Sequence, residues 1–100
     1  MLEINSNVNG NVNEVALVGR LDAKAARQAE EAFDGATEKV PNVVLDMSGL
    51  DYIASAGLRA LKRLRASVDA CGGTLVLKGV QEDVMEVFEM TGFAAMLTFE

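Results

Sequence analysis

Residues 51–60 read Asp-Tyr-Ile-Ala-Ser-Ala-Gly-Leu-Arg-Ala and join a predicted strand to a predicted helix. The apolar run Val43–Leu45 before them is typical of a buried strand. After them, apolar residues recur at the spacing of an amphipathic helix: Leu58, Leu61, Leu64, Val68 and Cys71. Ser55 is therefore expected at the helix start, as an N-cap whose oxygen accepts from the free amides of the first turn. The same place favours a phosphate, because those amides and the helix dipole both attract an anion.

Upstream of this stretch, the pattern predicts a hairpin followed by a helix. Leu2–Ile4 alternates like an edge strand, and Asn9-Gly10 is a strong signal for a type I′ turn. The continuous apolar run Val15–Val18 predicts a strand covered on both faces. An alanine-rich stripe over residues 25–36 predicts a helix that packs closely on the sheet, with Asp22 as a candidate cap.

Three further elements are predicted downstream. The apolar runs 43–47 and 74–77 predict two more buried strands, one on each side of the helix that follows Ser55. Glu82 begins a third helix with the charge that the helix dipole prefers, Gly92 ends it, and a short strand follows around Leu97.

This order of elements predicts an α/β fold in a single domain, residues 1–100. A hairpin followed by strand–helix–strand units indicates a mixed sheet of four or five strands that is parallel in its centre, with about three main helices. Three helices need not cover both faces of such a sheet. An exposed sheet face or edge is therefore expected to be available to a partner.

The composition is that of an ordinary globular domain, with 50% hydrophobic and 24% charged residues in a chain of 100. No stretch approaches the ~20 apolar residues that span a bilayer, and the start of the chain has no signal-peptide pattern. These observations predict no membrane association. The single cysteine, Cys71, fits a reducing, cytoplasmic setting, and its place on the apolar stripe predicts a buried thiol.

The net charge of −6 argues against general binding of nucleic acids. Residues 55–71 are an exception to the acidic balance, because they carry four cations against Asp69 alone: Arg59, Lys62, Arg63 and Arg65. Such a basic helix is either a solvated face or one side of a contact with a partner.

The chain lacks the residues that most enzymes need. It has no histidine, no Cys/His cluster for a metal and neither of the common glycine-rich nucleotide motifs, so no cofactor, no metal and no enzyme activity are expected. One alternative is a small catalyst or ligand carrier that uses Asp22, Asp46 and Asp51 at the carboxyl ends of parallel strands. Asp46 is better explained as an acceptor that stabilises a loop.

Four motifs in this order resemble the STAS-domain family, specifically the single-domain bacterial anti-sigma-factor antagonists. They are Gly19–Asp22, Val44–Leu50, Tyr52–Arg59 and Thr91–Phe93, and the resemblance covers nearly the whole chain. It implies a STAS-like fold, a role in transcription regulation and a partner-switching pathway.

The resemblance implies that Ser55 is the phosphorylation site, with Asp22 on a neighbouring loop. The partner is an anti-sigma factor that is itself a serine kinase: it binds the unphosphorylated antagonist and releases it by phosphorylating it, and a phosphatase restores binding. The surface expected to contact the partner comprises Asp22, Ala54, Ala56, Gly57, Leu58, Arg59 and Lys62. The chain departs from the family at Ala54, where an acidic residue often stands, and Ala56 leaves Ser55 as the only hydroxyl at the switch. The alternative within the same fold is a non-switching STAS subunit of a sensory or lipid-transport assembly.

Helical geometry supports an exposed position for the hydroxyl. At 100° per residue, Ser55 lies on the side of the helix that carries Arg59 and Lys62, away from the centre of the apolar stripe. We therefore expect Ser55 to face solvent or a partner, one turn from Arg59.

Overall fold

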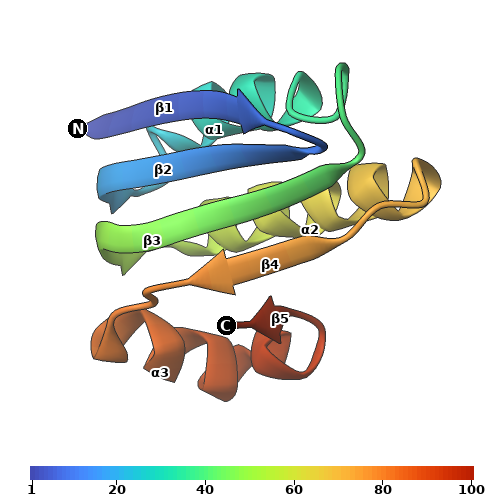
Figure 1. Cartoon of the computed structure of the whole chain (residues 1–100). Coiled ribbons are helices and arrows are strands. Elements are labelled where there is room, and N and C mark those ends of the chain that lie inside the picture. Colours follow the sequence, from blue (N-terminus) through green and yellow to red (C-terminus); the bar gives the residue numbers. More distant parts are fainter.

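The computed structural model describes residues 1–100 as five strands, three α-helices and one short 3-10 helix (Figure 1). In chain order these are β1 (Leu2–Asn9), β2 (Val12–Leu21), α1 (Ala26–Asp34), β3 (Asn42–Ile53), α2 (Ser55–Ala70), β4 (Leu75–Lys78), α3 (Glu82–Thr91), the 3-10 helix Phe93–Ala95 and β5 (Thr98–Phe99). The predicted end of the third helix at Gly92, which is left-handed at φ 82°, and the predicted short last strand are both present. No helix combines the length and the apolar character needed to cross a bilayer.

The five strands form one sheet in the order β1-β2-β3-β4-β5. β1 runs antiparallel to β2, and the pairs β2–β3, β3–β4 and β4–β5 are all parallel. The predicted mixed sheet with an N-terminal hairpin and a parallel centre is therefore confirmed.

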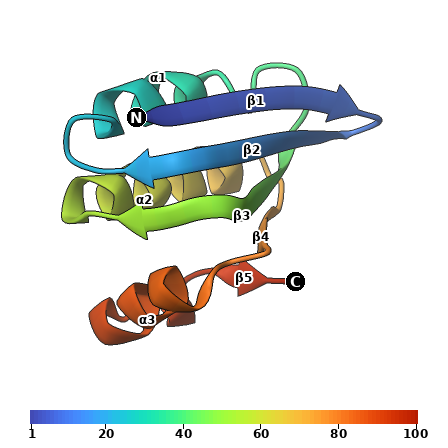
Figure 2. The same cartoon turned by 90° about the vertical axis from the view of Figure 1, so that its left-hand side faces the viewer.

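The helices cover one face of this sheet and leave the other face open. Figures 1 and 2 show α1 and α2 behind the sheet and α3 beside its β4–β5 end. In β2, Val15 and Leu17 are 1% and 0% exposed, whereas Val18 is 44% exposed on the opposite face. The prediction that Val15–Val18 is covered on both faces is thus wrong, because no helix packs on the second face. The expected exposed sheet face is present.

The hairpin turn differs in detail from the sequence prediction. Asn9 pairs with Val12, so the two residues at the tip are Gly10 and Asn11. Only Gly10 has a positive φ, 67°. A type I′ turn needs positive φ at both central residues, so the predicted turn type is wrong, and glycine in the first position is the pattern of a type II′ turn.

Cys71 is exposed, which corrects the prediction of a buried thiol. The apolar stripe is buried as far as Val68, but α2 ends at Ala70 and Cys71 is its C-cap. Gly72, at φ 71°, then turns the chain away. The helical period places Cys71 on the apolar stripe, but α2 ends at Ala70, so Cys71 lies beyond the part of the stripe that packs on the core.

Candidate functional site

The start of α2 lies at the carboxyl end of β3. Ala54, in an extended conformation at φ −97° and ψ 172°, is the N-cap, and its carbonyl oxygen accepts from the amide of Leu58 at 3.0 Å. Ser55 is the first residue inside the helix, and no side chain caps this end. The prediction that Ser55 is the N-cap is therefore wrong by one position. The Ser55 side chain therefore does not cap the helix.

The first turn of α2 keeps its amides free. No acceptor within the chain bonds the backbone N–H groups of Ser55, Ala56 and Gly57. The first turn also contains no acidic residue that would neutralise the positive end of the helix dipole. An anion placed here would find both hydrogen-bond donors and a favourable potential.

Ser55 is exposed, as the helical spacing predicts. Its hydroxyl makes no hydrogen bond within the chain, and its two alanine neighbours, Ala54 and Ala56, are partly exposed. Ser55 thus presents an exposed hydroxyl that is flanked along the chain by two methyl groups.

Gly57 and Leu58 are buried and build the packing of α2 against the sheet. A Cβ atom on Gly57 would lie 2.7 Å from Cγ of Leu21 and 2.9 Å from Cγ1 of Ile53, so this position needs glycine for close approach. Leu58 is 5% exposed and belongs to the hydrophobic core. Both residues were expected in the contact surface. Gly57 has no side chain and Leu58 points into the core, so neither offers a side chain to a partner.

Asp22 lies on the loop beside the start of α2. Its Oδ1 accepts a hydrogen bond from the amide of Ala25 at 2.9 Å, so it supports the first turn before α1, as the sequence suggested. The preceding residue, Leu21, accepts a hydrogen bond from the amide of Ala54 at 2.9 Å. The loop with Asp22 and the start of α2 are thereby joined at the same end of the sheet.

The four cations of α2 divide into two paired and two free side chains. Arg63 makes a bidentate contact with Asp34 of α1, at 3.0 and 2.8 Å, and Arg65 bonds Asp69 at 3.3 Å. Arg59 and Lys62 are exposed and have no carboxylate partner within 4.0 Å. The free positive charge is therefore on the side of α2 that carries Ser55.

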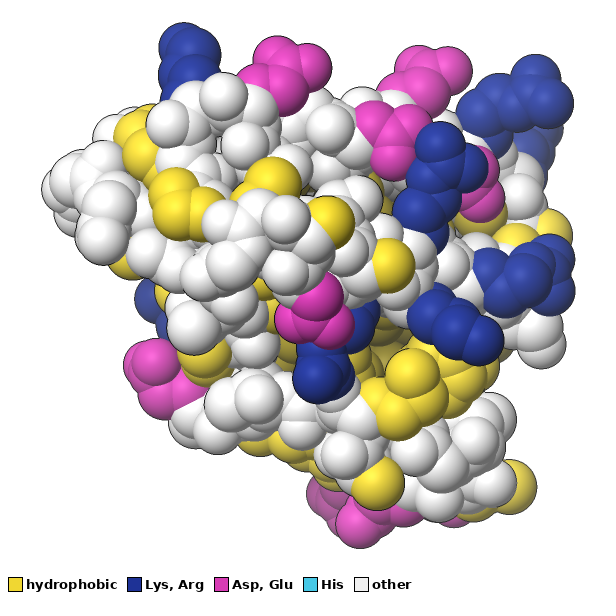
Figure 3. All heavy atoms as spheres, turned by 90° about the vertical axis from the view of Figure 1, so that its right-hand side faces the viewer, with side chains coloured by type: hydrophobic (Ala, Val, Ile, Leu, Met, Phe, Trp, Pro, Cys, Tyr) yellow, Lys and Arg dark blue, Asp and Glu magenta, His cyan; other side chains and the backbone are white.

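Seen from the end opposite Ser55, the surface mixes both signs of charge. Figure 3 shows Lys and Arg side chains gathered along one side of this end, with Asp and Glu side chains interspersed among them. Such interspersed charges are typical of a solvated surface.

Arg20 and Tyr52 form a contact for which the sequence analysis assigned no role. The guanidinium carbon of Arg20 lies 4.2 Å from the centroid of the Tyr52 ring, and Tyr52 remains 40% exposed. Arg20 and Tyr52 are register partners on β2 and β3. Both residues stand in the family motifs, but two extra residues on β3 shift the register, so spacing along the chain does not predict their contact.

The three aspartates of the catalytic alternative do not form one site. Asp22 bonds the amide of Ala25, and Oδ1 of Asp46 accepts from the hydroxyl and the amide of Ser48 at 2.7 and 3.0 Å. Asp51 is exposed, and its side chain makes no hydrogen bond within the chain. The bonds from Ser48, aided by nearby Lys78, lower the pKa of Asp46 below its ordinary value. Asp46 is thus the expected acceptor, although it sits inside a strand rather than in a loop. No group of three or more metal-binding side chains occurs in the chain.

Comparison with known proteins identifies the family. The model of the STAS domain matches residues 3–100. The chain belongs to the STAS-domain family. BtrV of Bordetella bronchiseptica, whose name gives it as a candidate anti-sigma factor antagonist, is 37% identical over 81 residues, covering 80% of this chain and 70% of BtrV.

Solved STAS-domain structures share the fold. A candidate anti-sigma factor antagonist from Thermotoga maritima superposes with a TM-score of 0.87 at 18% identity, over 96% of this chain and 84% of that one. The Bacillus cell fate determinant SpoIIAA in its phosphorylated form gives a TM-score of 0.74 at 18% identity, over 100% of this chain and 91% of that one. These likenesses confirm the expected STAS-like architecture.

Proposed function

We propose that this STAS domain is an anti-sigma-factor antagonist that works in a partner switch at Ser55. Unphosphorylated, it binds an anti-sigma factor that is also a serine kinase. Phosphorylation of Ser55 by that kinase releases it, and a phosphatase restores binding. This assigns the domain to the cytoplasm and to protein–protein contacts rather than to catalysis. The names of its relatives support the antagonist role.

The observation that carries the proposal is the state of the Ser55 hydroxyl. It is exposed, bonds nothing in the chain and stands at a helix start with three acceptor-free amides. A serine with a structural role at a helix start usually stands at the N-cap and accepts from the first-turn amides, whereas Ser55 stands one position later and bonds nothing in the chain. The unpaired cations Arg59 and Lys62 follow it one and two turns along the same side.

Phosphorylation is compatible with the folded domain. It adds about −1.5 to −2 charges, which the first-turn amides and Arg59 attract. The core residues of α2 lie on the opposite side of the helix and do not meet the phosphate. We therefore expect a phosphorylated domain that keeps its structure.

Phosphorylation is incompatible with a close contact over this site. A partner that packs against Ala54, Ser55 and Ala56 meets small side chains only. A phosphate there adds bulk and a charge that must lose its water. A loss of ~3 kcal/mol would lower affinity more than a hundredfold, which is enough for a switch.

The direct test combines phosphorylation with mass analysis. The chain is incubated with ATP and the serine kinase encoded nearby, and intact mass and peptide fragmentation locate the phosphate. We expect one phosphate, on Ser55, and none on the Ser55→Ala variant. Phosphate on Ser48 or Ser67, or binding to an anti-sigma factor that no phosphorylation changes, would contradict the switch and favour a non-switching STAS subunit.

A further inference from the structure

The outer edge of β1 has unpaired backbone groups. Strand β1 has a neighbour on one side only. The amide of Arg20 bonds the carbonyl oxygen of Met1 at 3.2 Å, which fixes the alternation along the antiparallel pair. The N–H and C=O groups of Ile4, Ser6 and Val8 therefore point away from β2, and no group in the chain bonds them.

This edge lacks the features that normally block strand pairing. Proteins protect edge strands with lysine, proline or bulges. From Ile4 to Asn9, β1 contains no charged residue and no proline, and its pairing with β2 is continuous, without a bulge. The only cover is at its start, where Nε2 of Gln28 donates to the carbonyl oxygen of Leu2 at 3.0 Å. The rest of the edge can accept another strand.

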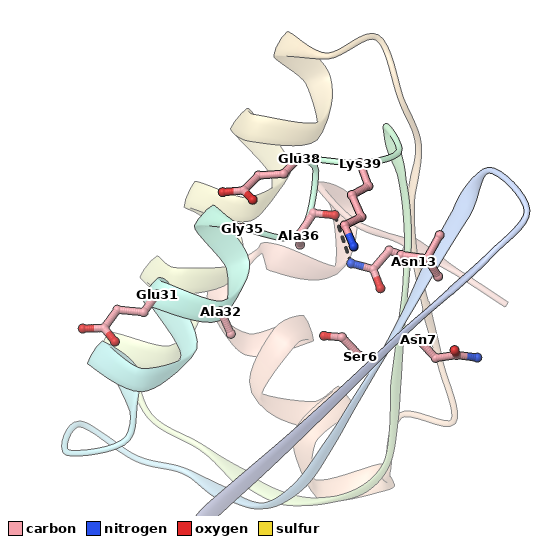
Figure 4. A pocket seen from close by; sticks show the side chains of 10 residues that line it. Ser6, Asn7, Asn13, Glu31, Ala32, Gly35, Ala36, Glu38 and Lys39 are labelled. Atoms are coloured by element: carbon pink, nitrogen blue, oxygen red, sulfur yellow. Dashed lines mark hydrogen bonds between the residues drawn. The ribbon is translucent and has the colours of Figure 1, made fainter.

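A hollow of about 500 Å³ lies on the helix side of this edge, between β1 and the end of α1. Figure 4 shows Ser6 and Asn13 extending into it from the strands and Lys39 reaching toward Asn13, with Glu31 and Glu38 at its outer rim and their carboxylates pointing outward. Its floor contains small residues, including Gly35. A side chain of an added strand has room to enter it.

Asn13 lines this hollow with an unused hydrogen-bond acceptor. The residue is only 6% exposed, and its Nδ2 donates to the carbonyl oxygen of Ala36 at 3.0 Å. Its Oδ1 is buried and accepts no hydrogen bond. A buried acceptor without a donor is costly, so this oxygen calls for an N–H or O–H group from outside the chain.

A second hollow, of about 250 Å³, lies on the open face of the sheet and extends from the same segment of β1 across β2 to Asp46 of β3 and Lys78 of β4. Each hollow is lined by two carboxylates and one lysine: Glu31, Glu38 and Lys39 on the helix side, and Glu14, Asp46 and Lys78 on the open side. None of these carboxylates is in a salt bridge. Side chains of an added strand alternate between the two faces, so those on one face lie over the hollow beside Asn13 and long ones on the other face point toward the open-side hollow. Each hollow has one more carboxylate than lysine, so its lining carries a net negative charge.

We propose that the edge of β1 binds an extended segment of another protein, which pairs with β1 as a sixth strand. The segment carries Lys or Arg side chains on both faces, and one of them donates to Oδ1 of Asn13. A second copy of this chain fits less well, because its own β1 contains no cation. Figures 1 and 2 also show α1 running along this edge, where a symmetric second copy would place a second α1.

This surface is separate from the switch. Asn13 is the second residue of β2, next to the hairpin, whereas Ser55 begins α2 after the end of β3. Figure 1 shows the hairpin and the start of α2 at opposite ends of the sheet. The proposed strand could therefore bind while an anti-sigma factor is bound or released. It does not depend on the proposed function.

The test uses two blocked nine-residue peptides with a Thr/Val host sequence, one with four Arg residues and a twin with Glu in their places. The ¹⁵N-labelled full chain is titrated with each and followed by NMR. We expect the Arg peptide to shift the amide signals of Ile4, Ser6 and Val8 and to protect them from exchange, with at least tenfold higher affinity than the Glu twin. Equal affinities, shifts confined to other elements, or pairing of two copies of the chain would overturn the proposal.

Two variants separate strand addition from general charge attraction. Ser6→Pro removes an outward N–H that the β1–β2 ladder does not use, and it should abolish protection along the edge. The double variant Glu31→Gln, Glu38→Gln should weaken the Arg peptide about tenfold. The matched control Glu86→Gln, Glu89→Gln removes the same charge from exposed positions of α3 and should leave affinity unchanged. An equal loss of affinity in the control would overturn the site. If Ser6→Pro does not fold, the comparison of the two double variants tests the proposal by itself.

Discussion

The backbone amide of Ala54 donates a hydrogen bond of 2.9 Å to the carbonyl oxygen of Leu21. This bond ties the N-cap of α2 to the end of β2, so the loop with Asp22 and the residue Ser55 are held at one end of the sheet. It also orients the first turn of α2, with Gly57 against Leu21 and Ser55 toward solvent. The proposed switch residue is therefore held on a scaffold fixed at both loops, so the proposed phosphorylation would not require the domain to refold.

Replacing Ser55 should separate binding from folding. Ser55→Ala removes the phosphoacceptor and should bind the anti-sigma factor constitutively. Ser55→Asp places a charge in the proposed contact and should bind at least tenfold more weakly, while circular dichroism and the unfolding midpoint stay unchanged. Calorimetric titration measures both variants. The control is Ser67→Asp, farther along α2; a similar loss in this control, or normal binding of Ser55→Asp, would contradict the switch.

Gly57→Ala should destabilise the domain. The added Cβ would lie 2.7 Å from Cγ of Leu21 and 3.0 Å from its carbonyl oxygen. Overpacking of this kind costs about 1–3 kcal/mol and outweighs the helix propensity of alanine, about 1 kcal/mol. Urea unfolding measures the difference. Gly35→Ala is the matched control, since its nearest neighbour would be 3.8 Å away at negative φ, and it should be neutral or slightly stabilising. Equal stability of the two variants would mean that α2 has room at Gly57.

The unpaired cations of α2 should matter for association and the paired ones for structure. Arg59→Ala and Lys62→Ala remove exposed charges with no partner in the chain, so stability should change by less than ~0.5 kcal/mol. Binding of the anti-sigma factor should weaken, mainly through a slower association that depends on salt. Arg63→Ala breaks the contact with Asp34 and should lower stability by about 1 kcal/mol or less, with association unchanged. If all three variants associate at the rate of the parent chain across a salt series, the basic side of α2 is only solvated.

Cys71 should react quickly with a thiol reagent in the native protein. It is exposed at the C-cap of α2, so labelling requires no unfolding. Labelling with Ellman's reagent, followed by absorbance, should proceed at a rate that denaturant raises little. Cys71→Ser should change the free energy of unfolding by less than ~0.5 kcal/mol. Slow labelling that accelerates sharply with denaturant would mean that the thiol is protected.

Asp46 should stabilise the fold at neutral pH and lose this effect in acid. Hydrogen bonds from Ser48 lower its pKa below the ordinary value of 3.8 in the folded state. A carboxyl with a lowered folded pKa contributes stability above its unfolded pKa, and that contribution is lost as the pH falls through the folded pKa. Asp46→Asn should thus be less stable than the parent chain at pH 7, and the gap should narrow as the pH falls below 3.8 and close once Asp46 is protonated in the folded state. Urea unfolding between pH 2 and pH 7 measures it. Ser48→Ala should show the same trend and add little to Asp46→Asn; a gap that is constant with pH would contradict the ionic contribution.

Local sequence patterns determined the order of the elements and the exposure of the switch. The helical period after residue 54 places the core on one side of α2, and this alone directs Ser55, Arg59 and Lys62 to the other side. The apolar runs likewise predict the strands, because a strand in the core must itself consist largely of apolar residues. The family motifs suggest the proposed role of Ser55 as phosphoacceptor, which the periodicity alone does not indicate.

The tertiary structure decided the features that depend on distant parts of the chain. The end of α2 before Cys71, the open face at Val18 and the register that brings Arg20 to Tyr52 all follow from how elements far apart in sequence pack. The same holds for the pairing of Arg63 with Asp34, which leaves Arg59 and Lys62 as the free charges. The periodicity of the sequence specifies which side of an element is apolar. Only the packing of the elements specifies which other element covers that side and how far along it the covering extends.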